Sequence, residues 1–309
     1  MTPPGRNISD SSGAWTSSTN ITLTGEEFEE IRRLIKATAG INLSTQKLSL
    51  VKSRLAKRLR ELGLSSYSDY IEMIKASGDG GELVEMINQI TTNKTDFFRE
   101  PHHFTFLKEK VLPAMVAQGK PGGERVLRCW SAACSSGEEP YSLAITLNDF
   151  FQEHPSWKWR LLATDLDTNM LAKAISGRYE ADRLAPVPAP VLRKYFQKPT
   201  HGESSIYTVK SFLRDKITFR KFNLMQANYP FKAPLNFIFC RNVLIYFDSQ
   251  DKLAILKKLH RALAPGGHLF VGHSESLMIA KDLFSNAGTT VYRKKEGLAA
   301  PGSIRPEPR

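Results

Sequence analysis

From about residue 123 onward, short apolar runs alternate with helical patterns, and this alternation limits the fold more than any other feature of the sequence. The apolar runs lie at 125–130, 159–164, 235–240 and 268–273, and helical patterns lie at 138–151, 167–176 and 250–264. A strand followed by a helix, repeated, is typical of a parallel sheet, because parallel neighbours need a long crossover that covers one face. We therefore predict an α/β fold with a mostly parallel sheet over residues 93–295.

Residues 178–222 interrupt this alternation. They contain the Pro-rich stretch PVPAP, a short helical pattern near 190–196, and two strand-like runs at 206–210 and 216–222. Short runs separated by turn-forming residues favour antiparallel pairing, so we predict an inserted antiparallel β-subdomain at 178–222. The run at 289–295 is expected to close the main sheet with an antiparallel edge strand.

The segments on either side of the predicted sheet have a different character. Helical periodicity, with breaks near Gly40 and Gly63, predicts an all-helical domain over residues 21–92. Residues 1–20 have no hydrophobic period and predict a disordered leader. Residues 296–309 contain several prolines and glycines and predict a tail.

Charge and cysteine content restrict the environment and the partners. The 43 lysines and arginines exceed the 31 acidic residues by 12, so the chain should attract a nucleic acid, an anionic membrane or an acidic protein. No apolar run approaches the roughly 20 residues that cross a bilayer, so we expect a cytoplasmic protein without membrane insertion. Three cysteines with no second Cys/His cluster predict reduced thiols and no metal site; they are Cys129, Cys134 and Cys240.

A basic helix is predicted from about Thr45 to Leu62. Its apolar face is formed by residues three and four positions apart, which are Leu48, Val51, Leu55, Leu59 and Leu62. Because successive residues turn by about 100° around a helix, Lys47, Arg54 and Arg58 form a row beside that face, with Lys57 further round. Two interpretations remain open, a solvated face and a binding face for an acidic partner.

The residues that follow each predicted strand are the candidates for chemistry, because ligands of open α/β sheets bind beyond the carboxyl ends of the strands. After the first strand, residues 131–137 are all small, so the backbone can approach a ligand closely before a helix begins near Glu138. Glu138 and Glu139 disfavour a phosphate site, and neither GxGxxG nor GxxxxGK[ST] is present. This loop therefore favours a cofactor that carries a positive charge.

Polar residues also follow the next strands. Asp165 follows the second strand, at the place where nucleoside-binding sheets put a carboxylate for ribose hydroxyls, and Asp167 is the expected N-cap of the following helix. Asn223 offers an amide that can donate to and accept from an adenine edge. Arg241 and Asn242 follow the strand at 235–240, with Tyr246 a helical turn further on.

The segment TTNKTDFFRE at 91–100 joins the helical domain to the sheet. Its Asn93, Thr95 and Arg99 have no periodic context that assigns them to a core. We expect this segment to lie across the cofactor cleft.

Five motifs occur in a fixed order, which is TTNKTDFFRE, SAACSSGEEPYS, TDLD, FCRNVLIYFD and LAPGGHLFVGHSES. With an all-helical domain in front of them, they closely resemble the CheR chemotaxis receptor methyltransferases over about residues 25–293. The combination of five linked motifs is highly specific, whereas any one of them alone would be weak. The resemblance implies a Rossmann-like class I methyltransferase sheet with an N-terminal all-helical domain and an inserted antiparallel β-subdomain.

The resemblance also implies an activity and a set of contacts. The implied enzyme is a protein-glutamate O-methyltransferase that uses S-adenosylmethionine, releases S-adenosylhomocysteine, and esterifies glutamates on the cytoplasmic helices of chemoreceptors. By motif matching, the family's cofactor contacts fall on Asn93, Thr95, Arg99, Glu138, Asp165, Asn223, Leu224, Arg241 and Asn242. Among these we expect Glu138 to face the cationic end of the cofactor, Asp165 the ribose diol, and Asn223 the adenine edge.

The implied reaction needs alignment more than proton transfer. A glutamate side chain is already ionised near pH 7 and the methyl group sits on a sulfonium, so we predict no general base. Arg99 and Tyr246 are the expected catalytic residues, because a guanidinium and a phenol can both donate to the incoming carboxylate. His102 and His103 are expected to be structural or surface residues, since no step needs them.

The resemblance raises the weight of the binding-face interpretation for the basic helix. The methylated receptor regions are acidic helical bundles, so Lys47, Arg54, Lys57 and Arg58 are expected to dock on them. The β-subdomain resembles the part that, in some family members, binds a peptide at the receptor's carboxyl terminus by adding a strand. No heptad stretch argues for anything beyond a monomer.

Two alternative functions remain open. The net charge is compatible with a nucleic-acid methyltransferase, but such enzymes usually show an Asn/Asp-Pro-Pro-Tyr/Phe-like turn after the fourth strand, where this chain has CRNVLIYFD. We therefore expect no nucleic-acid partner. The other alternative is a regulator that binds S-adenosylmethionine without catalysis, which Arg99 and Tyr246 disfavour.

Overall fold

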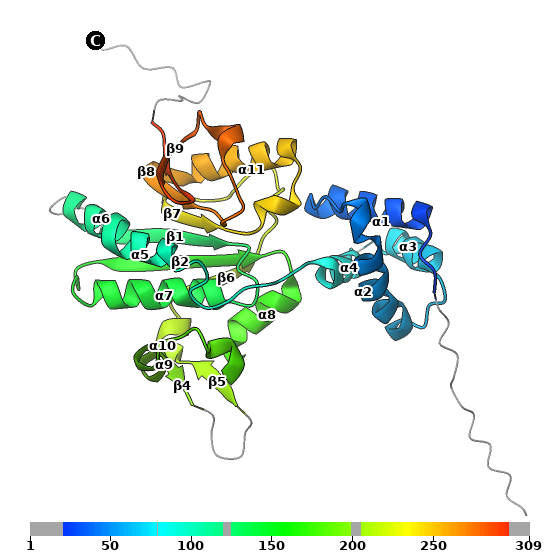
Figure 1. Ribbon diagram of the computed structural model, residues 1–309, viewed down its shortest axis with the longest axis horizontal. Helices are drawn as coiled ribbons and strands as arrows, with labels where there is room; N and C mark the ends of the chain where they lie inside the picture. The colour runs from blue at the N-terminus through cyan, green and yellow to red at the C-terminus, as the bar shows by residue number, and fades with distance from the viewer. Residues whose placement is uncertain (1–20, 79, 120–124, 199–204, 297–309) are drawn as a thin grey trace, which may run out of the picture.

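A computed structural model describes residues 21–78, 80–119, 125–198 and 205–296. A helical N-terminal domain and a larger sheet domain lie side by side (Figure 1). The predicted leader at 1–20 and nearly all of the predicted tail at 296–309 lie outside the described residues. No helix in the described part of the chain is long and apolar enough to cross a membrane.

The N-terminal domain is all-helical, as predicted. Its elements are α1 (Gly25–Ala39), η1 (Thr45–Lys47), α2 (Leu48–Glu61), α3 (Tyr67–Ala76) and α4 (Gly81–Ile90). Helix α1 begins with a capping box, in which the Thr24 hydroxyl accepts from the Glu27 amide and the Glu27 carboxylate accepts from the Thr24 amide. Helix α2 buries Val51, Leu55 and Leu59 against the other helices, which confirms its predicted apolar face.

A seven-stranded sheet forms the larger domain, and five of its strands are parallel neighbours. Its strands are β1 (Val126–Ala132), β2 (Lys158–Asp165), β6 (Ile217–Lys221), β7 (Leu235–Cys240), β8 (Leu263–Phe270), β9 (Phe284–Gly288) and β10 (Val291–Lys294). Their spatial order is β6-β2-β1-β7-β8-β10-β9. The order reverses between β1 and β7, which makes the carboxyl ends of these two strands the expected ligand crevice.

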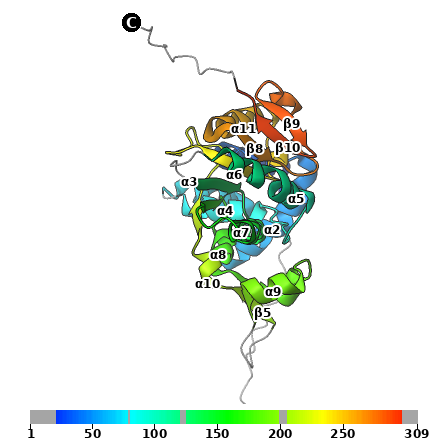
Figure 2. The same ribbon diagram turned by 90° about the vertical axis from the view of Figure 1, so that its left-hand side faces the viewer.

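Helices cover both faces of this sheet and create two hydrophobic cores (Figures 1 and 2). One core contains α7 (Glu138–Phe151) together with the connected helices α5 (His102–Phe106), η2 (Leu107–Val111) and α6 (Leu112–Gln118). The other core contains α11 (Ser249–Ala262). Helix α8 (Thr168–Ser176) connects β2 to the insertion. All three cysteines are free and buried, as expected for structural thiols.

The structure corrects two strand predictions. Residues 217–221 form β6, which pairs in parallel with β2 at the edge of the main sheet and is not part of the inserted sheet. Strand β10 is antiparallel, as expected, but β9 covers it and forms the edge instead. The sequence of β9, FSNAG, has one large apolar residue and therefore gave no strand signal.

The inserted sheet is small and antiparallel. It has the order β3-β5-β4, with β3 (Arg178–Glu180), β4 (Phe196–Gln197) and β5 (Ile206–Val209). The short helices η3 (Ala181–Leu184), α9 (Ala189–Tyr195) and α10 (Ser211–Arg214) accompany it. Figure 2 shows that this subdomain projects from the body below α7 and α8.

Polar contacts join the two domains next to the carboxyl ends of the strands. The Asn42 amide donates to the Tyr246 carbonyl at 2.8 Å, and Lys36 forms an ion pair with Asp248. Gly40 ends α1 with φ 72°, and a Cβ there would meet the Met225 side chain at 2.3 Å. Glycine at this position therefore permits both the left-handed turn and the close approach of the domains.

Candidate active site

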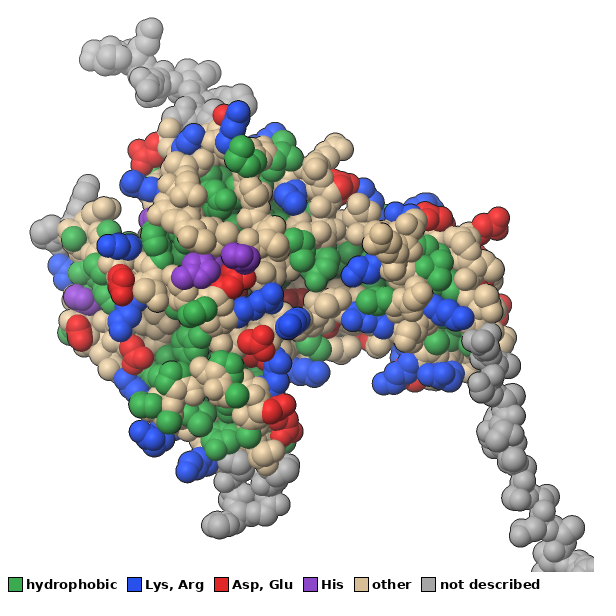
Figure 3. All heavy atoms as spheres, in the orientation of Figure 1, with side chains coloured by type: hydrophobic (Ala, Val, Ile, Leu, Met, Phe, Trp, Pro, Cys, Tyr) green, Lys and Arg blue, Asp and Glu red, His purple; other side chains and the backbone are tan. Residues whose placement is uncertain are grey.

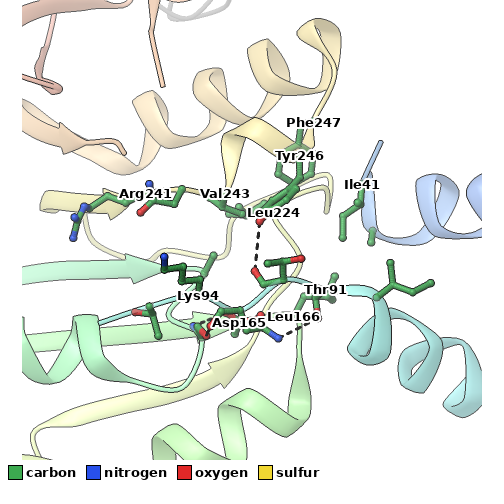
Figure 4. Close-up of a pocket in the computed structure, with 18 of the residues that line it drawn as sticks. Ile41, Thr91, Lys94, Asp165, Leu166, Leu224, Arg241, Val243, Tyr246 and Phe247 are labelled. Carbon is green, nitrogen blue, oxygen red and sulfur yellow. Dashed lines mark hydrogen bonds between the residues drawn. The ribbon is translucent and has the colours of Figure 1, made fainter. Parts of the chain in front are cut away.

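A pocket lies at the carboxyl ends of β1, β2 and β7, and the N-terminal domain forms its opposite wall (Figure 4). From the sheet domain it is lined by residues that directly follow or end these strands, including Ala133, Asp165 and Arg241. From the helical domain it is lined by residues between 39 and 50 and by Ile90. The reversal of strand order therefore coincides with a cavity that both domains enclose.

Most of the site residues predicted from the sequence line this pocket. They are Asn93, Thr95, Arg99, Asp165, Asn223, Leu224, Arg241, Asn242, Tyr246 and Lys47. The segment 91–100 crosses the pocket between the domains, as its lack of periodicity predicts. One predicted cofactor contact, Glu138, is not among the lining residues.

Of the two neighbouring carboxylates, Glu139 lines the pocket and Glu138 does not. The Glu138 carboxylate is buried on the far side of the loop, where it accepts from the Arg183 guanidinium at 2.5 Å and the Ser136 hydroxyl at 2.7 Å. Glu139 lines the pocket, one position further round α7. Since α7 is buried on nearly every side from Glu138 to Leu147, no apolar stripe in the sequence distinguishes the two carboxylates.

Asp165 is buried at the end of β2 and organises the loop around it. Its two oxygens accept from the amides of Ser135 at 2.7 Å and Asp167 at 2.8 Å. Burial raises the pKa of Asp165 to about 6, despite these backbone hydrogen bonds. Asp167 caps α8 by accepting from the amides of Asn169 and Met170, which confirms the predicted N-cap.

Two asparagines at the pocket already have partners within the protein. The Asn93 amide donates to Asp167 at 2.7 Å and so fastens the 91–100 segment to the start of α8. The Asn223 amide donates to the Thr38 carbonyl at 2.7 Å, and its oxygen accepts from the Met225 amide. Asn223 thus ties the domains together, and an adenine edge could use only its second amide hydrogen or lone pair.

Arg241 is the centre of a buried charge cluster. Its side chain is 1% exposed, and its guanidinium nitrogens lie 3.1 Å from Glu139 and 3.3 Å from Glu100. It also donates to the Arg99 carbonyl at 2.5 Å, which holds the 91–100 segment against the sheet. Burial raises the pKa of Glu139, although Arg241 opposes the shift. Arg241 therefore positions other residues of the pocket.

Arg99 and Tyr246 both line the pocket and have few hydrogen-bond partners. The Arg99 guanidinium donates to the Lys94 carbonyl at 2.7 Å. The Tyr246 hydroxyl donates to the Thr92 carbonyl at a long 3.4 Å, and burial raises its pKa. Arg99 retains further N–H donors for a ligand, and the single Tyr246 hydrogen could be redirected to a ligand because its present bond is long.

Glu275 holds a loop of the pocket in place, and it was not among the residues predicted from the sequence. Its buried carboxylate accepts from three backbone amides, those of Asn242 at 2.9 Å, Leu244 at 2.7 Å and Gly272 at 2.5 Å. It thereby shapes the loop that carries Asn242 and Tyr246. Nothing in the motif LAPGGHLFVGHSES indicates that its acidic residue points inward.

Several pocket segments contain residues in the left-handed region that favours glycine. Ala133, Ser135 and Asn242 line the pocket with φ of 64°, 49° and 58°, and Phe98 and Glu100 have φ of 53° and 57° in the crossing segment. Such conformations cost on the order of 1 kcal/mol or more each and cluster at functional sites. The hydrogen bonds to Asp165 and Glu275 hold two of these turns in place.

A histidine cluster borders the pocket. Ligand atoms of Glu100, His102 and His103 lie within 4.8 Å of one another, but the Glu100 oxygen also faces Arg241, whose positive charge opposes a cation there. Burial lowers the pKa of His103 to about 3, so its ring is neutral, and its Nε2 bonds to the Thr290 hydroxyl at 2.8 Å. His103 is therefore a core histidine that packs α5 on the sheet.

The basic helix differs from its prediction. Arg54 donates to the carbonyls of residues 89–91, and Arg58 pairs with Glu82 through two bonds of 2.9 and 2.6 Å. Both arginines therefore hold α4 against α2 and do not form a free row. The exposed positions are Lys57, which is 72% exposed, and Lys47 at the pocket rim.

Comparisons with known proteins agree with this architecture. Residues 93–293 match the family described as "CheR methyltransferase, SAM binding domain". Residues 26–91 match "CheR methyltransferase, all-alpha domain". The two matches meet where α4 ends and the pocket-crossing segment begins.

Curated relatives match over most of both chains. A "Chemotaxis protein methyltransferase" of Escherichia coli is 39% identical over 272 residues, which are 88% of this chain and 92% of the relative. A protein of the same name from Salmonella typhimurium is 40% identical over 272 residues, with 88% and 91% covered. A "Probable chemotaxis protein methyltransferase" of Rhizobium etli is 40% identical over 261 residues, with 84% and 96% covered. The chain belongs to the CheR methyltransferase family.

Proposed function

We propose that this protein transfers the methyl group of S-adenosylmethionine to glutamate side chains of chemoreceptors. The observation that carries the proposal is the pocket at the β1/β7 switch point, which combines two buried carboxylates, Asp165 and Glu139, with Arg99 and Tyr246. Membership of the CheR family and two-domain similarity to chemotaxis methyltransferases support it.

The residues of the pocket fit the donor. Glu139 offers a carboxylate to a cationic group, and Asp165 offers a carboxylate to hydroxyl donors. The small residues of the loop 131–137 let the backbone approach the ligand, and Leu166, Leu224 and Phe247 add apolar walls for a flat base. When bound, the donor supplies a methyl group that is already activated by its positive sulfur.

Methyl transfer then needs a correctly oriented glutamate and a pocket from which water is excluded. A glutamate oxygen forms the new bond to the methyl carbon while the carbon–sulfur bond breaks, and no proton moves. Arg99 and Tyr246 can donate to the glutamate and align it, and the N-terminal domain covers the pocket against water. Arg99 must align the glutamate more than stabilise it, because tight pairing would lower the energy of the bound substrate and so raise the barrier to reaction.

Direct methyl transfer tests the proposal. Enzyme is incubated with labelled S-adenosylmethionine and purified cytoplasmic fragments of a chemoreceptor, and RNA replaces the fragments in a parallel reaction. Label on the receptor that mild base releases, with mass spectrometry placing it on glutamates, is the expected result because esters are base-labile. Stable label, or label on RNA alone, would contradict the proposal.

Replacing Tyr246 with phenylalanine should slow turnover without weakening donor binding. The change removes one hydroxyl that donates to an ionised carboxylate, so we expect kcat to fall by about tenfold to a hundredfold. Affinity for S-adenosylhomocysteine, measured by calorimetry, should stay within about twofold. Weaker binding with unchanged kcat would assign Tyr246 to the donor site instead.

We also propose that Lys47 and Lys57 contact the acidic receptor helices. Both are exposed on the N-terminal domain, and Figure 3 shows basic side chains around the hollow between the two domains. Lys57→Glu should lower receptor methylation at low salt, with the deficit shrinking as salt rises. Its stability should be unchanged.

Arg58→Glu is the contrasting variant on the same helix. It should lower the free energy of unfolding by about 2–3 kcal/mol, because the half-buried Glu82 loses its cation and gains a like charge. Thermal unfolding separates the two variants. A stable Arg58→Glu protein with selectively lost methylation would restore the original docking role of Arg58.

The proposal extends to a receptor-tail site, a cellular location and an oligomeric state. The inserted sheet leaves both β3 and β4 unpaired on one side within the described residues, which suits addition of a strand from a receptor tail. The protein is proposed to act in the cytoplasm, where the receptor helices lie. It is proposed to act as a monomer, which sedimentation at working concentration tests.

A further inference from the structure

We propose that Arg183, in the inserted subdomain, is a positioning residue of the donor site that holds two pocket-lining segments in register. The inference rests on the proposed function only for the identity of the donor. Arg183 lies in η3, and its Nη2 donates to the Thr95 carbonyl at 2.6 Å and to the Glu138 carboxylate at 2.5 Å. Its Nη1 lies 3.5 Å from Asp96.

The three partners of Arg183 belong to two segments that form the pocket. Thr95 lies in the crossing segment 91–100 and lines the cavity. Glu138 is the first residue of α7 and directly precedes Glu139, the carboxylate that faces the cavity. One guanidinium therefore fixes the distance between the crossing segment and the start of α7.

The Glu138 carboxylate has Arg183 as its only charged partner among the described residues. Its side chain is 1% exposed, and besides Arg183 it accepts only from the Ser136 hydroxyl among the described hydrogen bonds. Removal of the guanidinium would leave a buried carboxylate with a single neutral donor, and the start of α7 would have to shift toward water. Glu139 would move with it.

Other side chains of the inserted subdomain contact the same two segments. The Tyr179 hydroxyl donates to the Ser136 carbonyl at 2.7 Å, so β3 supports the loop before α7. Phe97 of the crossing segment packs edge-on against Tyr179 at 4.9 Å and Phe196 at 5.6 Å between ring centroids. The subdomain that projects in Figure 2 thus forms the outer support of the donor pocket.

Arg183→Met tests the inference, because methionine keeps the length and apolar stem but loses the charge and donors. We expect the Kd for S-adenosylhomocysteine to rise about tenfold, and the KM for S-adenosylmethionine to rise in parallel, with kcat changed less than threefold. Arg178→Met, at an exposed position on β3 of the same subdomain, is the matched control and should match the wild type.

A purely structural role predicts a different pattern. In that case Arg183→Met would lower the melting temperature while Kd and KM, measured well below the transition, stay within twofold of wild type. That result would overturn the inference. If Arg183→Met does not fold, Arg183→Lys and Glu138→Gln replace it, and each should raise Kd by a smaller factor.

The double variant provides the pairwise test. If Arg183 acts through Glu138, Arg183→Met combined with Glu138→Gln should bind S-adenosylhomocysteine no more weakly than Arg183→Met alone. Additive losses in Kd would contradict the coupling. The Kd measurements use the product and no acceptor, so they test this inference even if the protein fails to methylate receptors.

Discussion

Arg241→Met is expected to lower the free energy of unfolding by about 3–5 kcal/mol, because removing one partner of a buried ion pair leaves uncompensated charge. The side chain of Arg241 is 1% exposed, and those of its partners Glu100 and Glu139 are 14% and 12% exposed. Without the guanidinium, two carboxylates face each other in a poorly hydrated region. Urea unfolding at pH 8 measures the loss.

The pH dependence of this deficit identifies its cause. Burial raises the pKa of Glu100, but Arg241, His273 and Asn242 overcome burial and leave the pKa lowered, so ionised Glu100 stabilises the fold above its unfolded pKa. Glu139 has a raised pKa, so its ionised form costs stability that protonation returns. Arg241 lowers the pKa of both carboxylates, so in Arg241→Met both pKa values should be higher and both groups should take up protons as the pH falls from 8 to 5, which shrinks the deficit. An equal deficit at both pH values would show that lost packing, and not charge, destabilises the variant.

Glu139→Gln is the matched control for this cluster. It keeps the shape of the side chain and removes the charge that burial disfavours, so its loss of stability should be smaller than that of Arg241→Met. Its affinity for S-adenosylmethionine should nevertheless fall, because the amide no longer attracts a cation. Stability and donor affinity therefore separate the structural and binding parts of the cluster.

The sequence was sufficient to predict where the pocket lies. Strand–helix alternation placed Asp165 and Arg241 after parallel strands, and the rule for open α/β sheets brings such residues to one edge. The structure has these residues around one pocket, at the point where strand order reverses. Short-range periodicity and a topological rule were therefore enough to predict the position of the pocket.

The same reasoning could not predict which way individual side chains point. Glu138 and Glu139 differ by one step on a helix that is buried on almost all sides, so the sequence contains no polar face to orient them. Arg54 and Arg58 align on the predicted helix, but their partners at residues 82 and 89–91 lie on α4, far along the chain. Long-range partners of charged side chains are fixed by tertiary packing and leave no local pattern.

The prediction that residues 217–221 belong to the inserted sheet was wrong for a related reason. Its alternation of buried Ile217 and Phe219 with exposed residues is typical of a strand with one covered face, which suited a small antiparallel sheet as well as an edge position. Only the pairing with β2, which returns the chain to the main sheet after the insertion, distinguishes the two. The left-handed backbone conformations of Ala133 and Ser135 could not be predicted either, since non-glycine residues rarely adopt them.

Binding of S-adenosylmethionine near pH 6 should release a proton from Asp165. Burial raises the pKa of this carboxyl from its usual 3.8 to about 6, so about half of the free protein is protonated there. Hydroxyl donors and a positive sulfur favour the ionised form, so binding should lower the pKa and release about 0.5 proton. Affinity should be constant above pH 7 and weaken below pH 6.

Calorimetry in two buffers with different ionisation enthalpies measures this release at pH 6, and at pH 8 it should vanish. Asp165→Asn should abolish it and weaken donor binding by about 2–3 kcal/mol, the cost of losing charge-assisted hydrogen bonds. In the free protein the raised pKa means that ionised Asp165 costs stability above pH 6, and bound donor compensates for that cost. Proton release that persists in Asp165→Asn would move the titrating group to Glu139, whose pKa burial also raises.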